Sequence, residues 1–508
     1  MKRYAEQSHA EYEILAMPAP VAALLTARSV AETLRRIPPK EYKVILTPGL
    51  MLGDVSPIEE ATGVPTFKGP RYAADLPIVL DLHGQVKLSK VVPACQLLKD
   101  ELKKRSLDEL LAVEKKRDQL LRKPGNMLIG SLPVGCDFPM RVIAEIADAP
   151  LLSDEQIAER ARHYQLSGAE MIDIGMTAGG GREDDARRAA RAAKSAVDIP
   201  ISIDTIDPAE AKAGVEAGAV LVLSVDGGNA EEMSGFAGEV AVVVIPTNHA
   251  EGYFPKDPDE RVEAMKKNLM TARSLGMKRI LADLIMDPVA SPGFVKSIVS
   301  FYKFKMDEPE VPLFCGVGNV VELLDADTPG VNALAAAVAS ELGVSVLLTT
   351  EASDKCRGSV KELSTASKMM FLARRRESVP TDLGIDLLLF KDKRSLEEPY
   401  DPAILEGATE VQPDSQQGVP MDPEGCFKVM IGRERGEIVA IHYPMHQRER
   451  PDLFLKGKTA QEIYHAAVSS DLVSDLGHSA YLGYELGKAE IALRTGKSYV
   501  QDSTLFSW

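Results

Sequence analysis

Acidic and amide side chains follow a series of short apolar runs in the middle third of the chain. These residues are, in order, Asp173 and Thr177, Asp204, Ser224 and Asp226, Asn248 and His249, Asp283 and Asp287, Asn319, and Glu351. The set offers many hydrogen-bond acceptors and few cations. It therefore suits a ligand with a 2-amino-4-oxopyrimidine edge, whose adjacent N–H groups a carboxylate accepts as a pair. For any single Asp, capping of a helix or turning of a loop is the alternative interpretation.

A glycine run lies just beyond Thr177, at Gly179, Gly180 and Gly181. Successive backbone N–H groups ahead of a helix can bind an anion. Lys355 and Arg357 are the cations that follow the last apolar run, and we expect them to face the same anion. A flexible loop without a ligand is the alternative for the three glycines.

The elements that must position these residues alternate regularly. We predict strands at 127–134, 170–176, 200–204, 219–226, 240–247, 278–286, 311–318 and 344–349. Amphipathic stretches predict helices near 153–167, 183–196, 208–217, 229–238, 257–275, 292–305, 329–342 and 357–375. Continuous Val/Ile/Leu runs are typical of buried parallel strands. Eight β/α units in about 250 residues match a closed TIM barrel, whose active site lies at the carboxyl ends of its strands. An open, doubly wound sheet is the structural alternative.

Two further modules flank this predicted (β/α)8 barrel, which spans 126–376. Residues 1–125 form an expected small α/β module, with strands at 12–17 and 43–47, a helix at about 20–37 and surface helices between 87 and 123. Residues 377–508 form an expected α+β module. It begins with a loop at 405–424, continues as a hairpin of 427–432 and 437–443, and ends in helices at 459–471 and 478–496.

Composition excludes several classes of function. The 508 residues carry a net charge of −16, so no basic excess favours nucleic acid or an anionic membrane. No apolar run reaches the roughly 18 residues that a membrane span needs. The five cysteines lie far apart without a CxxC pair, which favours reduced thiols in the cytoplasm and no bound structural metal.

Three consecutive segments carry a family resemblance: Gly168–Gly175, Pro200–Thr205 and Ala217–Ala219. They resemble the pterin-binding barrel shared by dihydropteroate synthases and methyltetrahydrofolate-dependent methyltransferases. The segments 252–261, 279–283 and 314–319 resemble the methyltransferase branch more closely. The whole chain, including the tail segment His478–Leu486, is similar to dihydropteroate synthase-related proteins of organisms that use tetrahydromethanopterin. The barrel resemblance covers about 127–350.

The resemblance implies that Asp204, Asp283 and Asn319 hold a pterin. A fourth pterin contact of the family, an Asn, falls on Leu223, beside Ser224. The diphosphate-binding residues of the synthases are replaced here by 176–181, by 318–320 and by 353–358. This departure leaves the reaction open.

Two reactions and one binding role are compatible with the resemblance. In the first, a dihydropterin diphosphate condenses with an arylamine in tetrahydromethanopterin or folate biosynthesis. Thr177, the three glycines, Lys355 and Arg357 would then face the diphosphate, together with Mg²⁺. In the second, Asn319 and a nearby Asp activate N5 of a methylated tetrahydropterin, and a corrinoid protein or a thiol accepts the methyl group. In the third, the protein binds a pterin without catalysis. We expect a homo-oligomer.

Overall fold

The computed structural model describes residues 2–17, 22–37, 41–81, 84, 87–391, 405–413, 421–433, 435–447 and 449–506. Its contacts divide the chain into two compact units, Met1–Leu387 and Leu388–Trp508. The N-terminal segment and the barrel fall within the first unit. The predicted domain boundaries at 125 and 376 stay a prediction.

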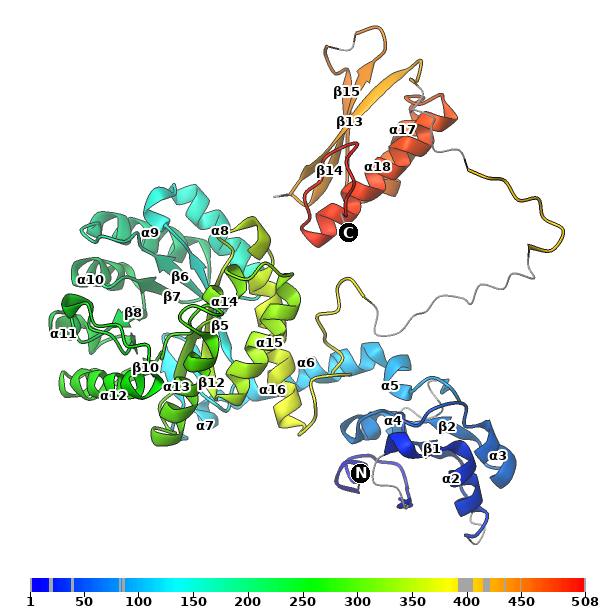
Figure 1. Ribbon diagram of the computed structural model, residues 1–508, viewed down its shortest axis with the longest axis horizontal. Helices are drawn as coiled ribbons and strands as arrows, with labels where there is room; N and C mark the ends of the chain where they lie inside the picture. The colour runs from blue at the N-terminus through cyan, green and yellow to red at the C-terminus, as the bar shows by residue number, and fades with distance from the viewer. Residues whose placement is uncertain are drawn as a thin grey trace. The chain divides into compact units, whose positions relative to one another are not determined.

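A closed barrel of eight parallel strands forms the centre of the first unit (Figure 1). Its strands are β5 (Arg141–Ile146), β6 (Met171–Gly175), β7 (Ile201–Asp204), β8 (Leu221–Val225), β9 (Ala241–Val244), β10 (Arg279–Ala282), β11 (Leu313–Gly316) and β12 (Val344–Thr350). The last strand pairs with the first, with Val346 opposite Arg141 and Thr350 opposite Glu145. The predicted TIM barrel is confirmed, and the open sheet is excluded.

Eight helices surround the barrel close to their predicted positions. They are α8 (Asp154–Leu166), α9 (Glu183–Ala196), α10 (Pro208–Ala217), α11 (Ala230–Ala237), α12 (Pro258–Ser274), α13 (Phe294–Asp307), α15 (Thr328–Glu341) and α16 (Ser359–Arg375). Local capping explains several starts: Ser153 and Gln156 form a capping box, and Asp207 accepts the N–H groups of Ala209 and Glu210. A short extra helix, α14 (Gly318–Glu322), was not predicted.

The prediction of the first barrel strand was wrong. Residues 127–134 form an antiparallel hairpin of β3 (Met127–Ile129) and β4 (Leu132–Val134), and β5 supplies the first barrel strand. Ile129, Leu132 and Val134 are buried in one cluster with the inward side chains of the barrel. The hairpin therefore closes the amino end of the barrel. An apolar run bounded by turns has the same sequence pattern whether it forms a barrel strand or a hairpin that covers the end of the barrel, so the pattern could not distinguish the two.

Alternation along the strands separates two apolar clusters. Inward residues such as Ile143, Met171 and Phe314 pack inside the barrel, whereas neighbours such as Val142 and Ile172 pack in the cluster that includes the surrounding helices. On β5, β6 and β10, the residue two positions beyond an inward apolar residue is acidic: Glu145 follows Ile143, Asp173 follows Met171 and Asp283 follows Leu281. On β7, Asp204 lies two positions beyond Ser202, which contacts Asp173. This parity turns Glu145, Asp173, Asp204 and Asp283 toward the inside of the barrel.

The N-terminal segment contains β1 (Ile45–Thr47) paired in parallel with β2 (Thr66–Lys68). Its helical elements are α1 (Lys2–Ala5), η1 (Ala22–Leu24), α2 (Ala27–Leu34), α3 (Ser56–Thr62), η2 (Ala73–Asp75), α4 (Leu76–Asp81), α5 (Ala94–Leu97), α6 (Lys99–Lys115) and α7 (Arg117–Leu120). The strand predicted at 43–47 is confirmed over its last three residues. The strand predicted at 12–17 is wrong, because those residues form no regular structure. The helix predicted at 20–37 shortens to α2 after η1, and residues 20 and 21 lie outside the described ones. Arg376, just after α16, pairs with Glu109 of α6 at 3.0 Å.

The second unit is an antiparallel sheet with two helices. Its strands are β13 (Gly425–Gly432), β14 (Glu437–Pro444) and β15 (Leu453–Gly457), and its helices are α17 (Ala460–Ser469) and α18 (Leu476–Thr495). The predicted hairpin and both helices are confirmed, and β15 was missed. Phe427, Ile438 and Leu486 lie in the shared core. The predicted loop at 405–424 includes 414–420, which lie outside the described residues. Across the described ranges, no helix combines the length and apolar character needed to cross a membrane.

Candidate functional site

Three carboxyl groups converge inside the carboxyl end of the barrel. One oxygen from each of Glu145, Asp173 and Asp204 lies within 4.8 Å of the others. Asp173 is completely buried, and its Oδ1 accepts a hydrogen bond from Ser202 Oγ at 2.6 Å. Its Oδ2 is buried without a hydrogen-bond partner among the described residues. Glu145 and Asp204 are only partly buried, whereas Asp173 is completely buried.

Glu145 was missed by the sequence interpretation because the strand that carries it was assigned to the wrong segment. The signal was present, since Glu145 closes an apolar run of inward and outward residues at 141–146. Its carboxylate passes directly over Gly175 on the neighbouring strand. A Cβ at position 175 would lie 2.4 Å from Glu145 Oε1. Glycine at this position therefore makes room for the third carboxyl.

The carboxyls hold protons more tightly than ordinary side chains. Burial, followed by repulsion from Glu145 and Asp283, raises the pKa of Asp204 to about 7. Burial raises the pKa of Asp283 to about 7, although the N–H of Ile285 and the charge of Arg261 act in the opposite direction. Burial and the neighbouring carboxyls also raise the pKa values of Glu145 and Asp173. At neutral pH the cluster is therefore poised between charged and neutral forms.

The donor set of this cluster fits a hard divalent cation. Within the part of the chain that the structure describes, no Lys or Arg forms an ion pair with Glu145, Asp173 or Asp204. Carboxylate oxygens are the preferred protein ligands of Mg²⁺. The cluster can be neutralised by shared protons, by such a cation, or by the N–H groups of a ligand.

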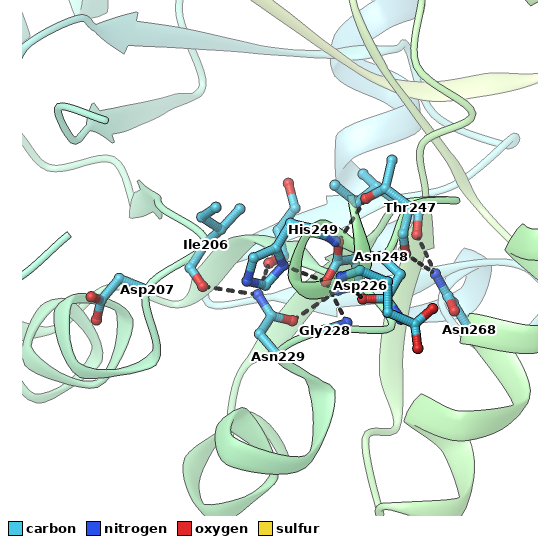
Figure 2. Close-up of polar contacts among 12 residues, drawn as sticks. Ile206, Asp207, Asp226, Gly228, Asn229, Thr247, Asn248, His249 and Asn268 are labelled. Carbon is cyan, nitrogen blue, oxygen red and sulfur yellow. Dashed lines mark hydrogen bonds and ion pairs between the residues drawn. The ribbon is translucent and has the colours of Figure 1, made fainter. Parts of the chain in front are cut away.

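A second polar network joins the loops after β8 and β9 (Figure 2). Asp226 is buried and accepts four hydrogen bonds: from Thr247 Oγ1 at 2.7 Å, Gly228 N–H at 2.7 Å, His249 N–H at 2.8 Å and His249 Nδ1 at 2.8 Å. Burial would raise the pKa of Asp226, but these hydrogen bonds together lower it below its usual value. The network fixes the imidazole of His249 against a carboxylate.

Amide side chains hold the same loops in place. Asn229 Nδ2 donates to the carbonyls of Ile206 and Ser224, each at 3.0 Å. Asn268 Nδ2 donates to the carbonyls of Ile245 and Thr247, each at 2.8 Å. Asn229, just before α11, and Asn268, within α12, were not predicted, because neither directly follows an apolar strand run in the sequence.

The glycine run adopts a conformation that only glycine adopts readily. Gly179, Gly180 and Gly181 have φ values of 116°, 70° and 76°. The N–H of Gly181 donates to Asp207 Oδ2 at 3.2 Å, so one of the predicted anion-binding amides already has an acceptor. Arg182 lies beside this loop, with Nη1 3.4 Å from Thr177 Oγ1 and Nη2 2.8 Å from Asp185 Oδ2. It was not predicted, although it follows the glycines directly.

The predicted cations after β12 have other partners. Lys355 Nζ donates to the carbonyls of Val321, Glu322 and Leu324 at the end of α14. Arg357 is exposed and pairs with Asp354 at 2.7 Å. The structure thus gives both residues local contacts, and their role toward an anion stays a prediction.

Four other predicted residues also make contacts within the protein. Glu351 accepts the N–H of Val360 at 3.1 Å and lies 3.2 Å from His163 Nε2. Asp287 is buried against Arg261 at 2.7 Å. Asn248 Oδ1 accepts the N–H of Glu251, at the start of the short turn η4 (His249–Glu251). Asn319 Nδ2 donates to the carbonyl of Met286 at 3.2 Å, while the side chain itself is exposed.

Two family models match parts of this chain. The pterin binding enzyme family matches residues 146–346, and the family described as PterinBD-DUF4346 matches residues 421–502. The uncharacterized protein MJ0107 of Methanocaldococcus jannaschii is 39% identical over 501 residues, covering 96% of this chain and 93% of that protein. A Ycf91-like protein of Nostoc is 31% identical over 112 residues, covering 17% of this chain and 88% of that protein.

Solved structures with a similar barrel include two dihydropteroate synthases. That of Stenotrophomonas maltophilia is 22% identical, with a TM-score of 0.41, and covers 51% of this chain and all of that one. That of Xanthomonas albilineans, in complex with 7,8-dihydropteroate, is 18% identical, with a TM-score of 0.38, and covers 48% of this chain and 96% of that one.

The fold and the family match together define the class of the first unit: residues 146–346 match the pterin binding enzyme family and lie in a closed barrel of eight parallel strands. Near-complete coverage at 39% identity places the chain in a narrower group, and it belongs to the same family as MJ0107 of Methanocaldococcus jannaschii.

Proposed function

We propose that this protein is a cytoplasmic transferase that joins a dihydropterin to an arylamine, a dihydropteroate synthase-like step in tetrahydromethanopterin or folate biosynthesis. The observation that carries the proposal is the group of inward carboxyls at the carboxyl end of a pterin-binding barrel. Asp204 and Asp283 supply acceptors for the adjacent N–H groups of the pterin ring. Their pKa values of about 7 allow them to bind this edge in the charged form near neutral pH.

The leaving group needs a positive environment. In a condensation, the methylene carbon of the pterin forms a bond to the arylamine nitrogen while its bond to the diphosphate breaks. Thr177, the amides of Gly179 and Gly180, and Arg182 are the donors in this loop that can face the departing anion. Mg²⁺ bound by Glu145 and Asp173 would supply positive charge beside it.

A direct assay tests the proposal. The purified protein is incubated with a hydroxymethyl-dihydropterin diphosphate and 4-aminobenzoate, with and without Mg²⁺, and the released diphosphate and the coupled pterin are quantified. We expect stoichiometric amounts of the two products, and loss of both in Asp283→Asn. Asp198→Asn, which changes an exposed carboxyl, is the matched control. Pterin binding without either product would contradict the condensation and favour a pterin-binding protein without catalysis.

Methyl transfer is the second candidate. The feature that favours it is the raised pKa of Asp204 and of Asp283, about 7 for each, because N5 of a methylated tetrahydropterin must gain a proton to become a leaving group. The side chain of Asn319 is exposed, and its Oδ1 could accept that N–H. Loss of methyl from a methylated tetrahydropterin on addition of a reduced corrinoid or a thiol, without diphosphate release in the first assay, would establish this reaction instead. Light scattering of the same preparation tests the expected homo-oligomer.

A further inference from the structure

The imidazole of His249 is oriented by its neighbours in a way that leaves one ring nitrogen for chemistry. The lowered pKa of Asp226 keeps this carboxyl ionised at neutral pH, so it can only accept hydrogen bonds. The ring nitrogen 2.8 Å away, Nδ1, must therefore carry the proton. In the neutral ring, Nε2 then holds the free electron pair. A carboxylate that fixes the tautomer of a histidine is the arrangement that proton-transferring histidines use.

The ring is held rigidly but remains accessible. The backbone N–H of His249 donates to the same carboxylate as its ring, so the two contacts fix both the loop and the side chain. Gly228 lies directly against the ring, and a Cβ there would be 2.8 Å from Nδ1 and 2.9 Å from Cε1. The side chain of Asp226 is 1% exposed, whereas that of His249 is 28% exposed. Within the described residues, the bonded ring nitrogen is Nδ1, and no hydrogen bond involves Nε2.

The Asp226–His249 pair lies at the same end of the barrel as the proposed pterin site. Asp226 follows β8, and His249 follows β9, so both lie at the carboxyl end of the barrel (Figure 2). The N–H of Asp283 donates to the carbonyl of Val244, the last residue of β9. The proposed pterin ligand Asp283 and the loop with His249 therefore continue from neighbouring strands. The carboxyl cluster on β5, β6 and β7 lies on the other side of β8.

We propose that His249, oriented by Asp226, is the base that accepts the proton of the attacking amine; this role rests on the proposed condensation. The nitrogen of the arylamine forms its bond to the pterin methylene carbon, and the carbon–oxygen bond breaks with its electron pair leaving on diphosphate. The nitrogen then carries an extra proton, which passes to Nε2 of His249 and from there to solvent. Among the described residues, the carboxyl cluster that could bind a metal ion consists of Glu145, Asp173 and Asp204. His249 is not part of this cluster, so we do not assign it a metal-binding role.

Two variants separate the base from a merely structural side chain. His249→Gln retains an amide N–H that can donate to Asp226, but it cannot take up a proton. We expect it to bind 6-hydroxymethylpterin within about twofold of the wild type and to lose about 100-fold or more in kcat of condensation. His249→Ala should be slow as well, and added imidazole should restore part of its rate. His465→Gln changes an exposed histidine of α17 and is the matched control.

The outcomes distinguish the two proposals. A wild-type protein that condenses the substrates, together with His249→Gln within about threefold of its kcat, would overturn the base and leave the proposed function intact. Slow His249→Ala without rescue by imidazole would also overturn the base. A wild-type protein that binds the pterin but forms no product would overturn the proposed function and the base together. Nitrogen-15 NMR of the wild type should show protonated Nδ1, and a ring protonated on Nε2 would contradict the geometry from which the role is inferred.

Discussion

The two ends of the barrel are built from the same strands but have opposite chemistry. At the amino end, Ile129, Leu132 and Val134 of the β3–β4 hairpin pack with inward residues such as Met171 in a buried apolar cluster. At the carboxyl ends of β5, β6 and β7, the inward side chains are carboxyls that repel one another. Burial stabilises the fold at the first end and raises the pKa values at the second. Stability and ligand chemistry are therefore separated along the barrel axis.

The largest expected effect concerns the amino end. Ile129→Ala removes a side chain that is 1% exposed, and we expect a loss of about 2–5 kcal/mol in the free energy of unfolding of the barrel. Pterin affinity should stay within twofold. Hydrogen-exchange mass spectrometry of the barrel strands measures the first quantity, and calorimetric titration measures the second. Leu128→Ala, on the opposite face of the same strand and 36% exposed, is the control, with an expected change below about 0.5 kcal/mol. A large loss of affinity in Ile129→Ala would show that the two ends are not independent.

At the carboxyl end, one substitution should weaken binding and strengthen the fold. Asp204→Asn removes an acceptor of the ring N–H groups and should cost about 2–4 kcal/mol of pterin binding. The pKa of this carboxyl is about 7 in the folded protein and 3.8 ordinarily, so the folded state binds the proton more tightly. Its contribution to stability is present at low pH and is lost as the pH rises from about 4 to about 7.

The amide of Asp204→Asn does not ionise, so the variant does not lose stability as the pH rises. After allowance for solvent screening, we expect the variant to exceed the wild type by about 1–2 kcal/mol at pH 8 and to show little difference at pH 4. Chemical unfolding of both proteins at pH 8 and pH 4 measures this difference in stability. A variant that is less stable than the wild type at pH 8 would show that Asp204 has a structural partner.

A smaller effect is expected from the glycine beneath Glu145. Gly175→Ala places a Cβ 2.4 Å from Glu145 Oε1, and we expect a loss of about 1–3 kcal/mol in stability together with weaker binding of Mn²⁺, used as a spectroscopic probe for Mg²⁺. Gly316→Ala is the matched control, because a Cβ there meets nothing within 4 Å. Equal effects of the two substitutions would remove the argument that position 175 makes room for the carboxyl.

The smallest effect is the pH dependence of binding. Asp204 and Asp283 lose their charges as the pH falls through about 7, and a neutral carboxyl accepts a pair of N–H groups poorly. Pterin affinity should therefore fall by about tenfold, or about 1.4 kcal/mol, between pH 8 and pH 6 for each of the two carboxyls that must be charged. Titrations with a pterin that does not itself ionise between pH 6 and pH 8 measure how the affinity changes with pH. An affinity that is flat between these values would mean that the carboxyls bind in their neutral form.

The alternation of residues along each strand determined much of this protein. Continuous apolar runs with a polar residue at the end predicted seven of the eight barrel strands, because a buried parallel strand requires that pattern. The same pattern placed Asp173, Asp204 and Asp283 at the carboxyl end, where the structure brings Asp173 and Asp204 together with Glu145. The family resemblance assigned the pterin, since the residues alone predicted only the kind of edge that the ligand presents.

Other features depended on contacts between distant segments. Whether 127–134 entered the barrel or closed it was decided by packing against Met171 and its neighbours, and this choice moved the first strand to 141–146 and brought Glu145 into the site. Lys355 donates hydrogen bonds to three backbone carbonyls. Asp226 accepts a hydrogen bond from His249, which lies twenty-three residues further along the chain. A strand pattern specifies which side of the sheet a residue faces. Which partner it meets there depends on the register and the loops of neighbouring strands, and these form only when the barrel closes.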